Sequence, residues 1–322
     1  MKKIAAVIIF AALLLVITIF GILFTQPGNN IMKPIIESKI NANLNQKIKL
    51  ETFSLRPSTF KIKLNLGNGS YVSSKGTYGL FSKTIDAKYD IKIAKLENIS
   101  PLIKMKLQGP FSTNGYIKGS KQLLNISGIS DVASSKTDYH LTMRKFKLTS
   151  INMSIKNAKL EKILYMLKYP RIFSSIMNGD ISYNLKTKKG VMNTHLINGR
   201  ILPNKMTFLL HNMARFDITK ELYKKTDIIS HINDNIITSD LDMRSRLTHI
   251  TSKNAVVDMK GEKVDAKLKI DIKKRPVYVK IKGNIKHPKI KLDIKELFMK
   301  KIQKKVNKLV PKNMQNIINK FQ

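Results

Sequence analysis

Apolar and polar residues alternate along most of the chain that follows residue 60. The clearest case runs from Val264 to Ile272, where every second residue is apolar and the residues between them are Asp or Lys. Successive side chains of a β-strand point to opposite faces, so a strand with this pattern has one apolar face and one polar face. Such strands are typical of an antiparallel sheet that is covered on one face only.

The same alternation recurs often enough to predict a mainly β fold. It appears in the segments 62–66, 89–93, 151–155 and 181–185. After Val264–Ile272 the chain is expected to turn at 273–276 and to return along 277–281, which predicts a hairpin. Gly283 is expected to interrupt the return strand, and a further strand is expected at 290–294.

Few segments have the apolar spacing of a helix. A break is expected at Pro27-Gly28-Asn29-Asn30, followed by an amphipathic helix over 34–46 with Pro34 in its first turn. The spacing also predicts a helix over 158–168, ended by Pro170, and another around 219–225. The helices are too few to cover a large sheet.

The N-terminus contains a segment without charge from Ile4 to Phe24, roughly as long as a bilayer core is thick. A cleaved secretory signal is the alternative, but it has a shorter apolar region and a small-x-small cleavage site, which we do not find. We therefore predict one uncleaved transmembrane helix, with Lys2 and Lys3 favouring a cytoplasmic N-terminus. The expected organisation is a cytoplasmic end at 1–3, a transmembrane helix at 4–24, a linker at 25–33, a periplasmic β-rich domain at 34–294 and basic helices at 295–322.

The C-terminal segment 295–310 combines helical apolar spacing with many lysines. A basic amphipathic helix either lies on a membrane surface or docks on a partner, and a helix that caps the end of the sheet would look the same. Pro311 ends it, and a last short helix is expected after that residue. The candidate membrane-surface residues are Lys300, Lys301, Lys304, Lys305 and Lys308.

Composition narrows the function further. The 322 residues include 59 Lys and Arg against 21 Asp and Glu, a formal charge of +38, and contain no Cys and no Trp. The missing cysteines exclude disulfides, thiolate metal sites and a Cys nucleophile. The charge is compatible with a solvated lysine-rich face or with attraction to anionic lipid headgroups. Nucleic acid is not an expected partner, because the lysines are spread along strands and no aromatic platform accompanies them.

No pattern of catalytic residues is found. The chain has no phosphate-binding glycine loop, no Gly-x-Ser-x-Gly and no His-Glu-x-x-His. Gly67-Asn68-Gly69 reads as a strand connection, and the six histidines are scattered. Asp240 and Asp242 are expected on the polar face of a strand over 237–247, paired with basic neighbours. We expect no enzyme activity, no cofactor and no metal.

The order of these elements resembles that of the AsmA-like proteins of Gram-negative envelopes. The residues that carry the resemblance are the stretch from Pro34 to Leu66, the segment Ala158–Asn178 followed by Gly179-Asp180-Ile181, and the closing hairpin with Gly283-Asn284-Ile285-Lys286-His287-Pro288-Lys289. The large members of that family are several times longer than this chain, which leaves open whether it bridges the periplasm.

The resemblance implies a curled, taco-like antiparallel sheet with an apolar groove, in an inner-membrane protein linked to phospholipid transport and outer-membrane assembly. The alternation agrees, since one-sided strands with few covering helices must hide their apolar face, and a lipid chain could share that space. A tethered scaffold for envelope proteins is the alternative, and a lipopolysaccharide-export component is a third. The candidate groove residues are Ile62, Leu64, Leu66, Ile91, Ile93, Ile151, Met153, Ile155, Tyr183, Leu268, Ile270, Val279 and Ile281.

Overall fold

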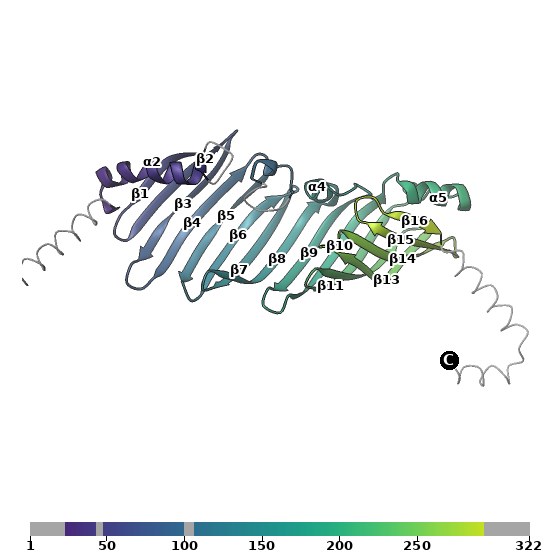
Figure 1. Cartoon of the computed structure of the whole chain (residues 1–322). Coiled ribbons are helices and arrows are strands. Elements are labelled where there is room, and N and C mark those ends of the chain that lie inside the picture. The colour runs from purple at the N-terminus through teal and green to yellow at the C-terminus, as the bar shows by residue number, and fades with distance from the viewer. Residues whose placement is uncertain (1–22, 43–47, 100–105, 293–322) are drawn as a thin grey trace, which may run out of the picture. The chain divides into compact units, whose positions relative to one another are not determined.

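The protein is a mainly β structure of sixteen strands (Figure 1), as the alternation predicts. The computed structural model describes residues 23–42, 48–99 and 106–292. The strands form one antiparallel sheet in which each strand lies beside its neighbours in the chain, from β1 to β16. Two compact units divide the chain: unit 1 has residues up to 168 together with 178–188, and unit 2 has 169–177 together with residues from 189.

Unit 1 contains the first eight strands and part of the ninth. They are β1 (Lys49–Leu55), β2 (Thr59–Gly67), β3 (Ser70–Gly79), β4 (Thr84–Ile93), β5 (Phe111–Ser120), β6 (Leu124–Val132), β7 (Ser135–Arg144), β8 (Lys147–Lys159) and β9 (Phe173–Asn184). The helical elements of unit 1 are α2 (Gln26–Ala42), η1 (Leu96–Ile99) and α4 (Leu160–Met166).

Unit 2 contains the remaining strands and two helical elements. The strands are β10 (Lys189–Ile201), β11 (Tyr223–Asn233), β12 (Ile236–Arg244), β13 (Thr248–Asp258), β14 (Lys263–Ile272), β15 (Arg275–Asn284) and β16 (Lys289–Leu292). The helical elements are α5 (Lys205–Ala214) and η2 (Ile218–Lys220).

Tight turns join most neighbouring strands. The predicted hairpin at 264–281 is confirmed, and its two turn residues are Lys273 and Lys274, with φ of 46° and 67°. Positive φ at both central residues gives a turn whose twist matches that of the flanking strands. Gly67-Asn68-Gly69 is confirmed as a strand connection, between β2 and β3. Gly283 does not interrupt β15, because it stays paired with Val264 at a φ of 104°.

The helices differ from the expectation in three places. The expected break at 27–30 is wrong, because α2 runs from Gln26 to Ala42 with Pro34 inside it. The helix expected at 158–168 is present but shorter, since β8 continues to Lys159 before α4 begins. The helix expected around 219–225 is wrong: η2 ends at Lys220, and Tyr223 begins β11 because its ring is drawn into the core of unit 2.

Side chains of α2 cap the free edge of β1. Asn29, Lys33, Glu37 and Asn41 are four residues apart, so they form one stripe along the helix. The bonds are Asn29 Nδ2 to Leu55 O (2.9 Å), Leu55 N to Asn29 Oδ1 (2.8 Å), Lys33 Nζ to Glu51 O (3.0 Å), Leu50 N to Glu37 Oε2 (3.1 Å), Asn41 Nδ2 to Ile48 O (2.9 Å) and Ile48 N to Asn41 Oδ1 (2.7 Å). The stripe therefore supplies partners that a neighbouring strand would otherwise supply.

Unit 2 has a packed core on one face of its sheet. Leu210 from α5 and Ile218 from η2 are fully buried against strand residues that include Tyr223, Ile250 and Ile270. Asn204 holds α5 in place as its N-cap, because its side chain accepts hydrogen bonds from the backbone of Met206 and Thr207.

None of the helices in the described ranges is long and apolar enough to cross a bilayer. Most of the expected transmembrane helix at 4–24, and the lysines expected at a membrane surface from Lys300 to Lys308, lie outside the residues that the structure describes.

Candidate functional site: the inner face of unit 1

One face of unit 1 carries a continuous apolar row from β1 to β8, and we call it the inner face. The strand register shows this directly, because residues paired across neighbouring strands lie on the same face. One row of paired residues crosses all eight strands near one end of them. It consists of Leu55, Phe60, Gly76, Ala87, Ile117, Ile126, Leu141 and Ile151.

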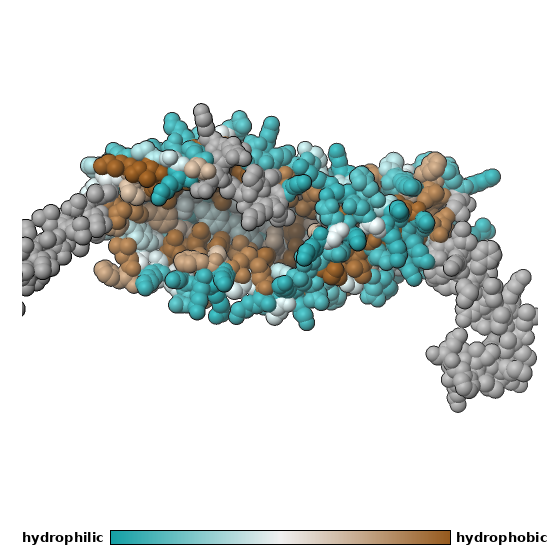
Figure 2. Space-filling model, viewed as in Figure 1, coloured by the Kyte–Doolittle hydropathy of each residue, from teal (hydrophilic) through white to brown (hydrophobic). Residues whose placement is uncertain are grey.

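This apolar row is long enough to contact an acyl chain along its whole length. With neighbouring strands about 4.8 Å apart, eight strands carry it over about 34 Å, more than the full thickness of a bilayer's hydrocarbon core. Apart from the buried Ala87, its members are half-buried: the described chain neither seals them nor leaves them fully open. Figure 2 shows apolar side chains gathered in a hollow over these strands.

A second row across the middle of the inner face is polar at its centre. Tyr89 and Tyr139 extend over the cross-strand pair Gly115 and Gly128, and their hydroxyl groups are hydrogen-bonded to each other. The Tyr89 hydroxyl also donates to Ser127 O (3.2 Å). Burial, followed by the hydrogen bond with Tyr139, raises the pKa of Tyr89, so the phenol stays neutral.

The glycine pair is what leaves room for the two hydroxyl groups. A Cβ on Gly128 would lie 2.7 Å from the Oη atoms of both Tyr89 and Tyr139, and one on Gly115 would lie 2.6 Å from Tyr89 Oη. The Tyr139 hydroxyl is also 2.7 Å from Thr113 Oγ1. The next row, which consists of Ile91, Thr113, Ser130, Thr137 and Ile155, is also polar at its centre, so the middle of the inner face is a polar patch bordered by apolar residues.

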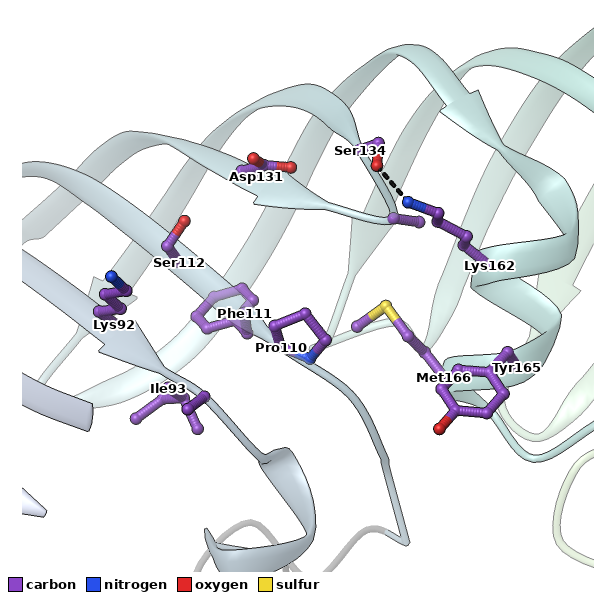
Figure 3. A pocket seen from close by; sticks show the side chains of 12 residues that line it. Lys92, Ile93, Pro110, Phe111, Ser112, Asp131, Ser134, Lys162, Tyr165 and Met166 are labelled. Carbon is purple, nitrogen blue, oxygen red and sulfur yellow. Dashed lines mark hydrogen bonds between the residues drawn. The ribbon is translucent and has the colours of Figure 1, made fainter. Parts of the chain in front are cut away.

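A cavity of about 370 Å³ lies where the inner face reaches α4 (Figure 3). Its apolar wall includes Ile93, Phe111 and Met166, which belong to or pack against a small buried cluster. Lys92 and Lys162 also line it, and Lys162 Nζ donates to Ser134 Oγ at 2.6 Å. Lys92, Ser112 and Asp131 are paired with one another, so they lie on the opposite face of the sheet from Ile93 and Phe111, and the cavity reaches both faces at the strand ends. With Asp131 as the acidic lining residue, its polar side has a net positive charge.

The structure brings the unit 1 candidates together on this face. Ile62, Leu64, Ile91, Ile151, Met153 and Ile155 lie in its paired rows. Leu66 and Ile93 lie at its end, in and around the cluster beside η1 and α4. Tyr183 faces the same way, since its neighbour Ser182 bonds Asn152 on the opposite face (2.9 Å). Of these residues, Ile93 is fully buried and the others are half-buried.

The unit 2 candidates have a different environment. Ile270 and Val279 belong to the packed core, with exposed fractions of 0% and 2%. Leu268 and Ile281 are half-buried and pack against that core. Ile270 and Val279 are therefore core residues in this structure, and the apolar face that remains accessible is that of unit 1.

Much of the inner face does not stand out in the alternation of apolar and polar residues. Ile117 and Ile126 were not recognised because Gly115, Gly128 and Thr113 occupy inner positions of the same strands, where small or polar residues weaken the apolar alternation. The local signal for this hairpin is Gly119-Ser120, which directly precedes the turn at 121–123.

The opposite face of unit 2 carries ion pairs. Arg244 Nε lies 3.1 Å from Asp242 Oδ1, and Lys253 Nζ lies 2.8 Å from Asp240 Oδ2, so the predicted ion pairing is confirmed. The strand itself ends at Arg244, three residues before the expected end at 247. The hydrogen bond from Arg244 lowers the pKa of Asp242. Within the described ranges, no three His, Asp or Glu side chains are placed to hold a metal ion.

Comparison of the chain with protein-family models, with curated proteins and with solved structures finds no match.

Proposed function

We propose that the protein is an AsmA-like, inner-membrane-anchored periplasmic protein of a bacterium, in which the sheet of unit 1 curls around an apolar groove. The groove holds lipid acyl chains, in phospholipid transport or outer-membrane homeostasis. The carrying observation is the apolar row that crosses eight strands while its side chains stay half-buried. The anchor rests on the uncharged segment Ile4–Phe24.

Contact between acyl chains and this face is favourable in free energy. Moving hydrocarbon out of water is favourable by about 0.8 kcal/mol per CH2 group. An acyl chain that binds to the half-buried row removes apolar surface of both from water, so the contact is stabilising. The face lowers the free energy of a lipid chain in the aqueous space between two membranes. No bond is made or broken in this process.

The cavity beside α4 offers a binding site for the polar headgroup of the lipid. The cavity beside α4 joins the apolar side chains of Phe111 and Met166 to the ammonium groups of Lys92 and Lys162. A headgroup with a phosphate fits such a lining, because lysine binds phosphate as a point charge. The hydroxyl groups of Tyr89 and Tyr139 add a polar contact midway along the face.

The experiment is photo-crosslinking in cells with the full chain. A photoreactive amino acid replaces Ile151 on the inner face, and the matched control replaces its neighbour Asn152, which lies on the opposite face. Mass spectrometry of the captured product is expected to find lipid at position 151 and none at position 152. Folded protein that captures no lipid at 151 would refute the groove, and protein captured there would favour the scaffold alternative.

A further inference from the structure

Three consecutive hairpin tips along one edge of unit 1 share an unusual composition. In a sheet whose strands follow chain order, every second turn lies on the same edge, so the β3–β4, β5–β6 and β7–β8 turns lie side by side, along the lower edge in Figure 1. These turns are 80–83, 121–123 and 145–146. We call them the tip row.

Each turn of the tip row exposes a large apolar side chain. Phe81 is 99% exposed, Phe146 is 63% exposed and Leu123 is 41% exposed. Single exposed apolar residues are ordinary, but a row repeated on three successive tips indicates a contact surface. With two strands per hairpin, the tips follow one another at about 10 Å.

Phe146 is also placed where the backbone disfavours it. Lys145 and Phe146 have φ of 51° and 60°, a left-handed conformation that normally selects Gly, Asn or Asp. Across the described ranges, Phe146 is the sole large apolar residue among the non-glycine positions with positive φ. Its mostly exposed ring gains little from packing within the chain, so folding alone does not explain a Phe here.

The charge of the tip row has one sign. Lys83, Lys121 and Lys145 are all exposed, and none of the three turns contains Asp or Glu. The acidic residue nearest to them in the sequence, Asp86, is paired with Lys118 at 3.1 Å. In unit 2 the hairpin turns β11–β12 and β13–β14 contain Asp234 and Glu262, so these two turns lack the composition of the tip row.

We propose that the tip row is a membrane-contact edge that lies on an anionic lipid bilayer. The phenylalanine and leucine side chains enter the interfacial region, and the lysines meet anionic headgroups. Charge complementarity selects an anionic bilayer, because the turns offer ammonium groups and no carboxylate. This surface is separate from the inner face, and its existence does not depend on the groove.

The absence of Trp in the chain makes the test direct. Phe81→Trp and Phe146→Trp each introduce a single fluorophore on the tip row, and Phe208→Trp introduces one on α5, where the native ring is 65% exposed. The full chain is reconstituted in vesicles of phosphatidylcholine and phosphatidylglycerol in equal parts, with and without lipids brominated on the acyl chain. Quenching and a blue shift are expected at positions 81 and 146, and neither at position 208.

A second experiment tests the lysines of the tip row. Since one basic residue near an anionic surface contributes about 1 kcal/mol, replacing Lys83, Lys121 and Lys145 by Gln in the Phe81→Trp background is expected to weaken the contact about 100-fold. The matched control removes the same charge from exposed lysines of unit 2 (Lys224, Lys260 and Lys289) and is expected to leave the quenching within about twofold.

Three results would overturn the proposal. Equal quenching at 81 and 208 would mean that contact is not specific to the tip row. Equal loss in the two lysine triple variants would mean that only net charge matters. A tryptophan at 81 that brominated lipid does not quench would mean that the tip row does not contact the bilayer, and its shielding from aqueous iodide would assign the tip row to contact with a second copy of the chain. Lipid capture at Ile151 is unaffected by any of these results, so the groove and the tip row fail separately.

Discussion

The polar stripe of α2 should control the integrity of the sheet edge, and Asn29→Ala tests this most sharply. Asn29 is 5% exposed and pairs with both the N–H and the C=O of Leu55. The substitution leaves two backbone groups without these partners. Each unpaired group lowers stability by about 1–3 kcal/mol when it is shielded from water. The higher helix propensity of Ala offsets about 0.7 kcal/mol of this loss. We expect a net loss of about 2 kcal/mol.

The readout is hydrogen exchange of the backbone amides of 48–55, measured by mass spectrometry on the full chain. A loss of about 2 kcal/mol corresponds to about 30-fold faster exchange at Leu55, because local opening governs protection there. Asn30→Ala is the matched control: it makes the same change on the same helix at an exposed neighbour whose side chain has no hydrogen bond within residues 23–42, 48–99 and 106–292. Asn41→Ala should repeat the effect at Ile48, whose N–H and C=O it pairs. Equal exchange in Asn29→Ala and Asn30→Ala would refute the edge-capping role.

Three further predictions concern unit 2. Leu210→Ala, at a residue with 0% exposure, should cost about 3 kcal/mol in denaturant unfolding followed by circular dichroism, and a cost below about 1 kcal/mol would contradict the packed core. Burial raises the pKa of Tyr223 to about 12, above its unfolded value of about 10, so stability should fall as the pH rises from about 10 to about 12. The melting temperature of Tyr223→Phe should not show this fall between about pH 10 and about pH 12. If the variant and the native chain have the same pH profile, the role assigned to Tyr223 is wrong. The pKa of Asp242 is lowered, chiefly by Arg244, so its contribution is present above about pH 4 and is lost at lower pH. Asp242→Asn should melt at a temperature that depends less on pH in that acid range, and the same slope as the native chain would contradict the ion pair.

The sequence was informative where alternation was uninterrupted. The hairpin at 264–281 was predicted because β14 has apolar residues at every inner position and Asp or Lys at every polar position. β5 and β6 were harder because Gly115 and Gly128 lie on the inner face, where they make room for tyrosine hydroxyl groups from other strands. That requirement is a tertiary one, and no local pattern contains it.

The helices show the same limit. α5 was missed because Met206, Phe208, Leu209 and Leu210 are too closely spaced to show a single apolar stripe, although Asn204 and Thr207 form a capping box that marks its start. α2 passes through 27–30, where Gly and Asn predicted a break, and Asn29 gains two hydrogen bonds from β1 that a local pattern does not contain. Tertiary contacts outweigh propensity at such positions.

The candidate site was predicted in part. The alternation placed the unit 1 residues on one face, because a two-residue period fixes the side of a strand on which a residue lies. The alternation does not predict that Ile91 is half-buried while Ile270 is fully buried. That difference in burial arises because α5 and η2 cover the sheet at Ile270. Covering elements from distant parts of the chain decide which apolar face remains accessible.

The strictly sequential order of the strands bears on how such a chain is built and how it changes in evolution. Each new strand docks on the one made just before it, so the sheet can grow from its first strand onward without waiting for the end of the polypeptide. Adding or deleting a whole hairpin preserves every other pairing, much as a repeat array gains or loses units. Proteins of very different length can therefore share this plan.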